Sequence, residues 1–167
     1  QLLPLYKDKN MLTETDKFGE DALMYASERG FGQVVNILLP HFNDESKITD
    51  CTPNGINNIM LAAMNGHNDV LQILVPYFDD DQITACNVQG VTALMFASQD
   101  GHYEVVTTLL PYFKKAGKIE CKVGGLTALD AARAKNHENV VQLLLNSTSP
   151  CSSPVLEEEL PPSCFQQ

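Results

Sequence analysis

The sequence has no tryptophan, few basic residues and no long apolar run. Lysine and arginine number 11 against 21 aspartates and glutamates, which gives a formal net charge of −10. That balance disfavours binding to nucleic acid and to anionic lipid, because both depend on clustered lysine and arginine. No apolar stretch approaches the about 20 residues of a membrane-spanning helix. We therefore expect neither nucleic-acid binding nor membrane insertion.

The chain has five cysteines, an odd number that does not suggest a fully paired disulfide framework. The chain does contain enough apolar residues to form a core, at 44% of 167 residues. This composition is that of a folded chain, and its length allows one domain or one compact array.

The chain repeats itself. Glycine recurs at Gly19, Gly55, Gly90 and Gly125, with spacings of 36, 35 and 35 residues. Seven residues after each of these glycines stands an alanine: Ala26, Ala62, Ala97 and Ala132. An aliphatic pair follows nineteen and twenty residues after each glycine, at 38–39, 74–75, 109–110 and 144–145. Agreement at so many offsets indicates a true internal repeat.

Each copy predicts two short helices. Residues that cap helix starts stand two after each glycine: Asp21, Asn57, Thr92 and Thr127. Residues that close helices in the left-handed conformation follow about two turns later: Gly30, Gly66, Gly101 and Asn136. Helices this short are marginal alone, so they must stack on neighbouring copies and form a solenoid.

The repeats resemble the ankyrin repeat. Residues 90–110 read GVTALMFASQDGHYEVVTTLL, which is similar to that family's G-x-T-P-L-H-x-A-A-x-x-G-H-x-E-V-V-x-x-L-L. The resemblance covers roughly residues 1–146. It implies an all-α solenoid of helical hairpins with projecting β-hairpin-like loops, and a concave face that binds other proteins. It also implies that the histidines His67, His102 and His137 tie neighbouring units together by hydrogen bonds.

The chain departs from that family after each second helix, where it reads Pro40-His-Phe42, Pro76-Tyr-Phe78 and Pro111-Tyr-Phe113. Proline lacks an N–H and resists helix interiors. We therefore expect each proline to stop the helix and each following aromatic residue to fold back over the apolar ridge.

Three segments are expected. Leu2-Leu3-Pro4-Leu5-Tyr6 matches the end of a second helix, so residues 1–15 are predicted to be the end of a truncated upstream repeat. Residues 16–146 are the four-repeat array. Residues 147–167, rich in Ser, Pro and Glu, are predicted to be a flexible tail or linker. The alternative for the tail is a short binding motif or phosphorylation at Ser149 or Ser153.

No pattern indicates catalysis. Cys51, Cys86 and Cys121 occupy equivalent positions in successive repeats, which keeps them apart, so we interpret them as half-buried residues at loop bases rather than disulfide or zinc ligands. The three repeat histidines are spread in the same way, whereas a catalytic site needs converging groups. We expect no enzyme activity, catalytic residue, metal, cofactor or small-molecule substrate.

Residues at the loop tips and on the outer turn of each first helix are not fixed by the stacking of repeats. By the ankyrin resemblance, these residues line the binding face. The predicted partner-binding residues are Lys17, Phe18, Glu20, Tyr25, Glu28, Arg29, Asn54, Ile56, Met64, Asn65, Gln89, Val91, Phe96, Gln99, Asp100, Leu126 and Lys135. The same positions also include Pro53, Leu61, Val88 and Val123. The competing interpretation is that Tyr25, Leu61 and Phe96 pack inward against neighbouring repeats.

The favoured function is a protein–protein interaction module, a regulatory or targeting segment of a larger intracellular protein. We expect it in the cytoplasm, with the nucleus as the alternative. Two other functions stay open: an architectural spacer without its own ligand, and a substrate-positioning segment of a larger signalling enzyme such as a kinase. The sequence does not identify the partner, because fold alone does not carry specificity.

Overall fold

The computed structural model describes residues 14–42 and 45–148. The predicted repeat end at 1–15 and the predicted tail at 147–167 therefore lie outside the described residues, apart from two residues of each.

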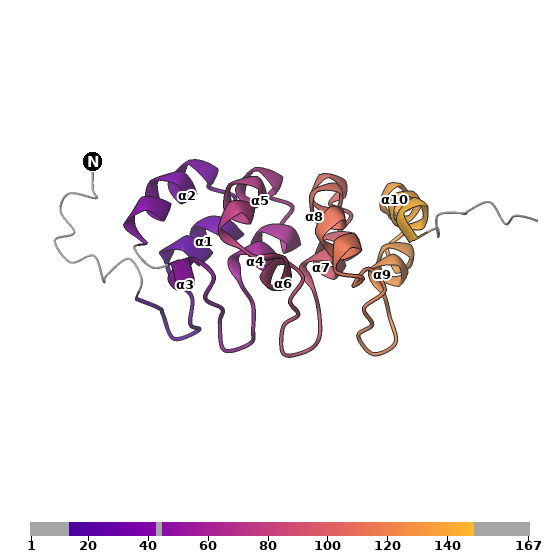
Figure 1. Ribbon diagram of the computed structural model, residues 1–167, viewed down its shortest axis with the longest axis horizontal. Helices are drawn as coiled ribbons and strands as arrows, with labels where there is room; N and C mark the ends of the chain where they lie inside the picture. Colours follow the sequence, from indigo (N-terminus) through magenta and orange to yellow (C-terminus); the bar gives the residue numbers. More distant parts are fainter. Residues whose placement is uncertain (1–13, 43–44, 149–167) are drawn as a thin grey trace, which may run out of the picture.

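The described residues form four helical hairpins in a row, as Figure 1 shows. The hairpins are α1 (Ala22–Glu28) with α2 (Gly32–Leu38), α4 (Asn58–Met64) with α5 (Asn68–Leu74), α7 (Ala93–Gln99) with α8 (Tyr103–Lys115), and α9 (Ala128–Ala134) with α10 (Glu138–Thr148). First helices lie in one layer and second helices in another, and a loop projects before each first helix (Figure 1). This is the predicted all-α helical-hairpin solenoid.

The predicted caps begin and end the first helices. Side-chain oxygens of Asp21, Asn57, Thr92 and Thr127 each accept a hydrogen bond from the backbone N–H three residues on. At the other end the backbone turns left-handed at Gly30, Gly66, Gly101 and Asn136, with φ between 60° and 76°. Both predictions are confirmed.

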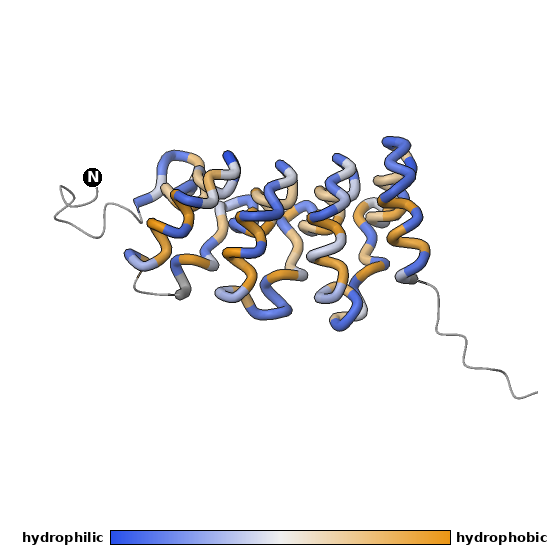
Figure 2. Tube along the Cα trace, turned by 90° about the horizontal axis from the view of Figure 1, so that it is seen from above, coloured by the Kyte–Doolittle hydropathy of each residue, from blue (hydrophilic) through white to orange (hydrophobic). Residues whose placement is uncertain are grey.

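The core runs along the whole row, and Figure 2 shows apolar residues recurring in each hairpin. The repeat alanines Ala62, Ala97 and Ala132 have no exposed surface. Because alanine has a small side chain, neighbouring first helices can approach closely there. Burial of one hairpin on the next is what stabilises helices of only seven residues.

The expected proline stops are confirmed in two repeats and wrong in the third. Helices α2 and α5 end just before Pro40 and Pro76, which lie in the short 3₁₀ turns Leu39–His41 and Val75–Tyr77. Pro111 instead lies inside α8, which continues to Lys115. The aromatic residues fold back in all three: Phe42, Phe78 and Phe113 are buried.

The residue after the aromatic explains this difference. Asp79 follows Phe78 and caps the short helix α6 (Asp80–Ile83), with a reciprocal hydrogen bond between Asp79 and Gln82 that holds the chain extended at that point. After Phe113 stand Lys114 and Lys115, which do not cap a helix start and are favoured at a helix end by the helix dipole. The helix therefore continues through the proline at the cost of one hydrogen bond.

Candidate protein-binding surface

The residue three before each repeat glycine folds the projecting loop in the first three repeats. Asp16 accepts hydrogen bonds from the N–H groups of Phe18 and Glu20, at 2.8 and 3.0 Å. Asn87 does the same for Gln89 and Val91, at 3.0 and 2.9 Å. These side chains satisfy loop N–H groups that would otherwise require water.

In the second loop Thr52 Oγ1 accepts from the N–H of Ile56 at 3.2 Å. The fourth loop has Lys122 at this position, and lysine cannot accept a hydrogen bond. There Val123 and Leu126 exchange backbone hydrogen bonds instead, around two glycines of positive φ. The sequence interpretation missed this role, although the Asp, Thr and Asn at one repeat position were a readable signal.

The two inner loops are joined to each other. The N–H of Val88 in the third loop donates to the carbonyl oxygen of Asn54 in the second, at 3.0 Å. A Cβ placed on Gly55 would lie 3.1 Å from the Cα of Asn87, so the two backbones are in close contact. Loops two and three therefore form one platform of fixed shape.

Large apolar side chains stand exposed near the loop tips. Phe18 is 60% exposed, Val88 69% and Leu126 62%, and Pro53 is also exposed. Scattered exposed apolar residues are ordinary in soluble proteins. The ones in this chain, however, lie in the same region of successive loops. Together they give the loop edge the apolar anchors that protein interfaces use.

A cleft of about 310 Å³ separates the tips of the first and second loops. Its lining includes Phe18, Pro53 and Ile56 together with the charged Lys17 and Glu20. The ammonium of Lys17 lies 4.7 Å from the centre of the Phe18 ring, in the range of a cation–π contact. The cleft has room for a side chain of a partner.

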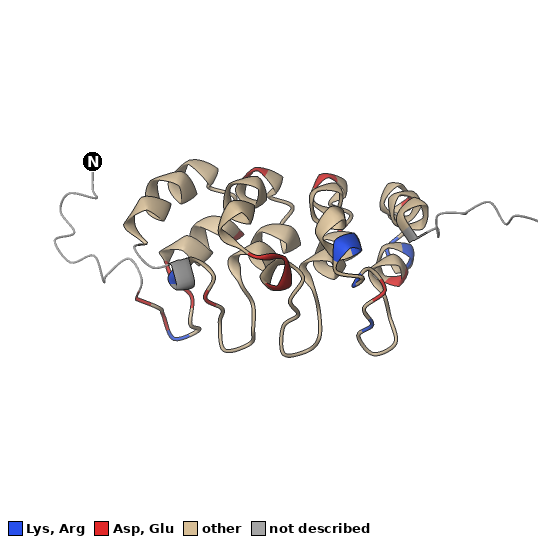
Figure 3. Ribbon diagram, in the orientation of Figure 1, with Lys and Arg blue, Asp and Glu red and all other residues tan. Residues whose placement is uncertain are grey.

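Charge is distributed unevenly along the row. No Asp, Glu, Lys or Arg occurs in residues 51–68 or 82–99, which form the loop and first helix of the second and third repeats. Figure 3 shows these two loop tips without coloured residues. Residues 14–29 of the first repeat carry five acidic and two basic residues, whereas the equivalent residues 120–135 of the fourth carry two acidic and three basic. The edge is thus neutral at its centre, acidic at one end and slightly basic at the other.

The predicted partner-binding residues divide into two sets. The exposed ones are Lys17, Phe18, Tyr25, Arg29, Asn54, Asn65, Gln89, Gln99, Asp100, Leu126 and Lys135. The half-buried ones are Glu20, Glu28, Ile56, Met64, Val91 and Phe96.

The inward-packing alternative is correct for one of its three residues. Leu61 is buried. Phe96 is half-buried and packs against the core while part of its ring stays accessible. Tyr25 is 42% exposed, and its hydroxyl donates to Asp16 Oδ2 at 2.8 Å.

The hydrogen bond between Tyr25 and Asp16 shifts the pKa values of both side chains. The hydrogen bond to the Asp16 carboxylate raises the pKa of Tyr25 to about 12. The backbone N–H of Glu20, together with Tyr25 and the N–H of Phe18, lowers the pKa of Asp16 below its usual value. Both shifts favour the state with Asp16 ionised and Tyr25 protonated, so this end of the surface keeps one arrangement at neutral pH.

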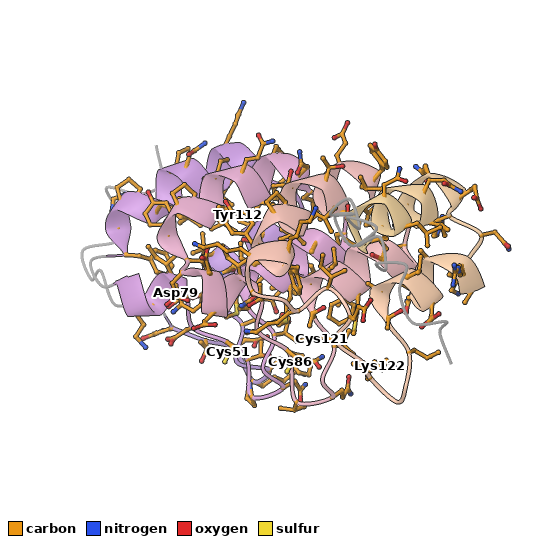
Figure 4. All side chains as sticks on the ribbon, turned by 45° about the vertical axis from the view of Figure 1, so that its right-hand side comes forward. Cys51, Asp79, Cys86, Tyr112, Cys121 and Lys122 are labelled. Atoms are coloured by element: carbon orange, nitrogen blue, oxygen red, sulfur yellow. The ribbon has the colours of Figure 1, made fainter. Side chains whose placement is uncertain are left out.

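The three loop-base cysteines occupy successive loops, as Figure 4 shows. All three are free thiols. The expectation that they are half-buried is correct for Cys121 and wrong for Cys51 and Cys86, which are exposed. Each exposed thiol precedes a buried residue, Thr52 or Asn87, and neighbouring side chains of extended backbone point to opposite sides.

The repeat histidines link units. Nε2 of His67 donates to the carbonyl oxygen of Glu28, and that of His102 donates to the carbonyl oxygen of Met64, both at 3.0 Å. Each bond joins a repeat to the last turn of the preceding first helix, as the resemblance implied for these two histidines. Within the residues that the structure describes, the His137 side chain makes no such bond, so the expectation is wrong for the third histidine. Within residues 14–42 and 45–148, no three His, Cys, Asp or Glu side chains are grouped to hold a metal. None of the helices described is long and apolar enough to cross a bilayer.

The comparisons with known proteins agree with this architecture. A family model described as "Ankyrin repeats (3 copies)" matches residues 1–83, 23–122 and 59–153. No curated protein matches the chain significantly. Ankyrin repeats are generally modules for protein–protein interaction. The overlapping matches, the capped hairpins and the histidine links show that the chain belongs to the ankyrin repeat family.

Proposed function

We propose that this chain is a non-enzymatic module that binds a partner protein through the tips of its loops and the adjacent first helices. The module acts as a regulatory or targeting segment of a larger intracellular protein, in the cytoplasm. The observation that carries the proposal is the charge-free platform of the second and third loops, defined here by Pro53, Asn54, Val88 and Gln89, in which Pro53 and Val88 are exposed apolar residues.

Rigidity supports this platform as a binding site. The hydrogen bond from Val88 to Asn54 and the Asn87 bonds within the third loop fix both tips before a partner arrives. A pre-formed surface avoids the ordering cost that a flexible loop meets on binding. The exposed side chain of Val88 is then free to enter a pocket of the partner.

The distribution of charge along the array indicates the chemistry of the partner surface. An uncharged platform accepts an apolar or neutral segment without burying an unpaired charge. The acidic excess of residues 14–29 favours basic groups on the partner near the first repeat, and the small basic excess of residues 120–135 favours acidic groups near the fourth. The partner surface is therefore apolar at its centre and oppositely charged at its two ends.

The test compares two variants of the tagged chain in affinity capture from cell extract. Val88→Asp places a charge on the platform, and we expect the captured partner to fall at least about tenfold, the effect of losing one interface anchor. Tyr103→Asp is the matched control, because Tyr103 is exposed at the start of a second helix, away from the loops. Both variants should keep the parent melting temperature.

Equal capture by the two variants contradicts the proposal. Such a result is what an architectural spacer without its own ligand predicts. A substrate-positioning role within a larger enzyme predicts the same loss of captured partner for Val88→Asp. That role differs from the proposed one in a second observation: the captured protein becomes chemically modified when the parent enzyme is present.

A further inference from the structure

The first repeat presents a second apolar surface, distinct from the loop tips. We call it the N-terminal face and define it by Ala22, Phe31, Val34 and Ile37. Phe31 is 56% exposed, Val34 42% and Ile37 52%, and Ala22 is exposed too. All four lie on helices α1 and α2 or at their junction.

Two of these four positions are buried in every later repeat, and the positions of Phe31 and Ile37 are half-buried there. The residues equivalent to Val34 are Val70, Val105 and Val140, and each has 0% exposure. Those equivalent to Ala22 are Asn58, Ala93 and Ala128, with exposures of 0–1%. In each case the preceding hairpin covers them. Within residues 14–42 and 45–148, the N-terminal face therefore has the composition of an interior repeat interface, and no hairpin packs on it.

The inner interfaces specify what fits such a face. A Cβ built on Gly30 would lie 2.4 Å from Nδ1 of His67, so that histidine rests directly on the glycine of the preceding repeat. A Cβ on Gly32 would lie 3.4 Å from Cδ1 of Ile73. Phe31 and Ile37 occupy the positions of His67 and Ile73 in the first repeat. A matching cover presents small residues to both.

The sequence supplies the register of such a cover. Leu2-Leu3-Pro4 repeats Leu38-Leu39-Pro40, and Pro4 precedes Gly19 by 15 residues as Pro40 precedes Gly55. The first match to the ankyrin family begins at residue 1, so this segment aligns with the repeat pattern. The sequence of this segment matches the sequence in which α2 ends, and its distance to the next repeat glycine is the same.

We propose that the N-terminal face is the docking surface for one further ankyrin-type hairpin, to which Leu2–Tyr6 belong, and that it is not a site for a second copy of the chain. This interface is independent of partner binding at the loop tips. It extends the array by stacking, and it leaves the platform of the second and third loops unchanged.

The test builds the cover from the chain itself. Residues 15–37 are duplicated in place of Gln1, directly before Leu2, so that Gly30 and Gly32 of the added unit meet Phe31 and Ile37. Val34→Asp is then made in either the inner or the outer copy of the duplicated hairpin. The inner copy should be covered and the outer copy should remain open, which makes the two variants matched controls for one substitution.

We expect the outer substitution to change the thermal midpoint little. The inner one should lower it by about 10 °C, because it buries a charge without a partner. Equal effects of the two substitutions would overturn the proposal. So would a concentration-dependent dimer of the original chain, in sedimentation, that Val34→Asp abolishes, because a second copy would then occupy the face.

Discussion

The inner pair of loops and the outer pair share a purpose but differ in construction. The second and third loops are uncharged and joined by a backbone hydrogen bond from Val88 to Asn54. The first loop depends on the ionised Asp16, and the fourth on glycines without a side chain to hold it. Repetition therefore fixes where each loop starts and ends, whereas single residues decide its rigidity and its charge.

This difference has a consequence for recognition. A tight, neutral centre can bury a partner's apolar side chains, and charged ends can orient the partner and speed its approach. Neither property follows from the ankyrin fold, since the same hairpins carry both kinds of loop. Substitutions that exchange features between inner and outer loops should therefore separate the contribution of shape from that of charge.

The largest effect is expected from adding a methyl group where the inner loops touch. Gly55 has φ +76° and its neighbour is the backbone of Asn87, which cannot move aside as a side chain could. Gly55→Ala should cost about 2–4 kcal/mol, from the left-handed conformation together with overpacking. Gly125→Ala, at φ +88° with open space around it, should cost only about 1 kcal/mol.

Urea unfolding measures the stability loss of the Gly55→Ala and Gly125→Ala variants. Because repeat arrays can unfold in more than one step, the midpoint of the first transition is the quantity to compare. If Gly125→Ala costs as much as Gly55→Ala, the close packing of the two inner loops does not contribute to stability and the comparison fails.

A smaller effect is expected from removing the acceptor that folds the third loop. Asn87 is 5% exposed and its Oδ1 accepts two backbone N–H groups. Asn87→Ala should cost about 1–2 kcal/mol in the same unfolding measurement, since both donors lose their partner. Partner capture should fall as well, because the tip that presents Val88 loosens.

Asn87→Asp is the informative control for this change. Aspartate keeps the acceptor oxygen, as Asp16 does in the first loop, and places a charge on the neutral platform. We expect it to retain more stability than the alanine variant and yet to weaken capture. Full capture by Asn87→Asp would mean that the absence of charge at the centre is irrelevant to the partner.

Much of the fold could be predicted from the sequence because every unit stacks in the same way, so that equivalent positions need the same types of residue. The four helix caps, the closing residues and the buried aromatics at 42, 78 and 113 were predicted correctly. The path through Pro111 was not, because the outcome depends on whether the next residues can cap a new helix, a competition between local bonds that repeat spacing does not express.

The candidate surface was less predictable for a related reason. Position in the repeat indicates which side chains can face outward, but exposure depends on the neighbouring unit. Leu61 and Tyr25 occupy the same repeat position, and the first is buried while the second is 42% exposed. In the first repeat the exposed Tyr25 also has a partner in its own loop, since its hydroxyl donates to Asp16.

The smallest effect is expected at that contact, where charge rather than packing holds the first loop. Asp16→Asn removes the carboxylate that accepts from Tyr25, so the pKa of Tyr25 should fall from about 12 toward its ordinary value. Tyrosinate absorbance during an alkaline titration measures the change, with Tyr25→Phe identifying which transition belongs to this residue.

The same carboxylate makes the first loop sensitive to acid in a way that the third loop is not. The folded-state pKa of Asp16 lies below its unfolded value, so its stabilising contribution is present above the unfolded pKa and is lost as the pH falls through the folded pKa. Asn87 has no charge to titrate. Hydrogen exchange of loop amides at decreasing pH should therefore show the N–H of Phe18 and Glu20 losing protection relative to those of Gln89 and Val91. Parallel loss at both loops would indicate that the array opens as a whole and that the ionised carboxylate does not hold the first loop separately.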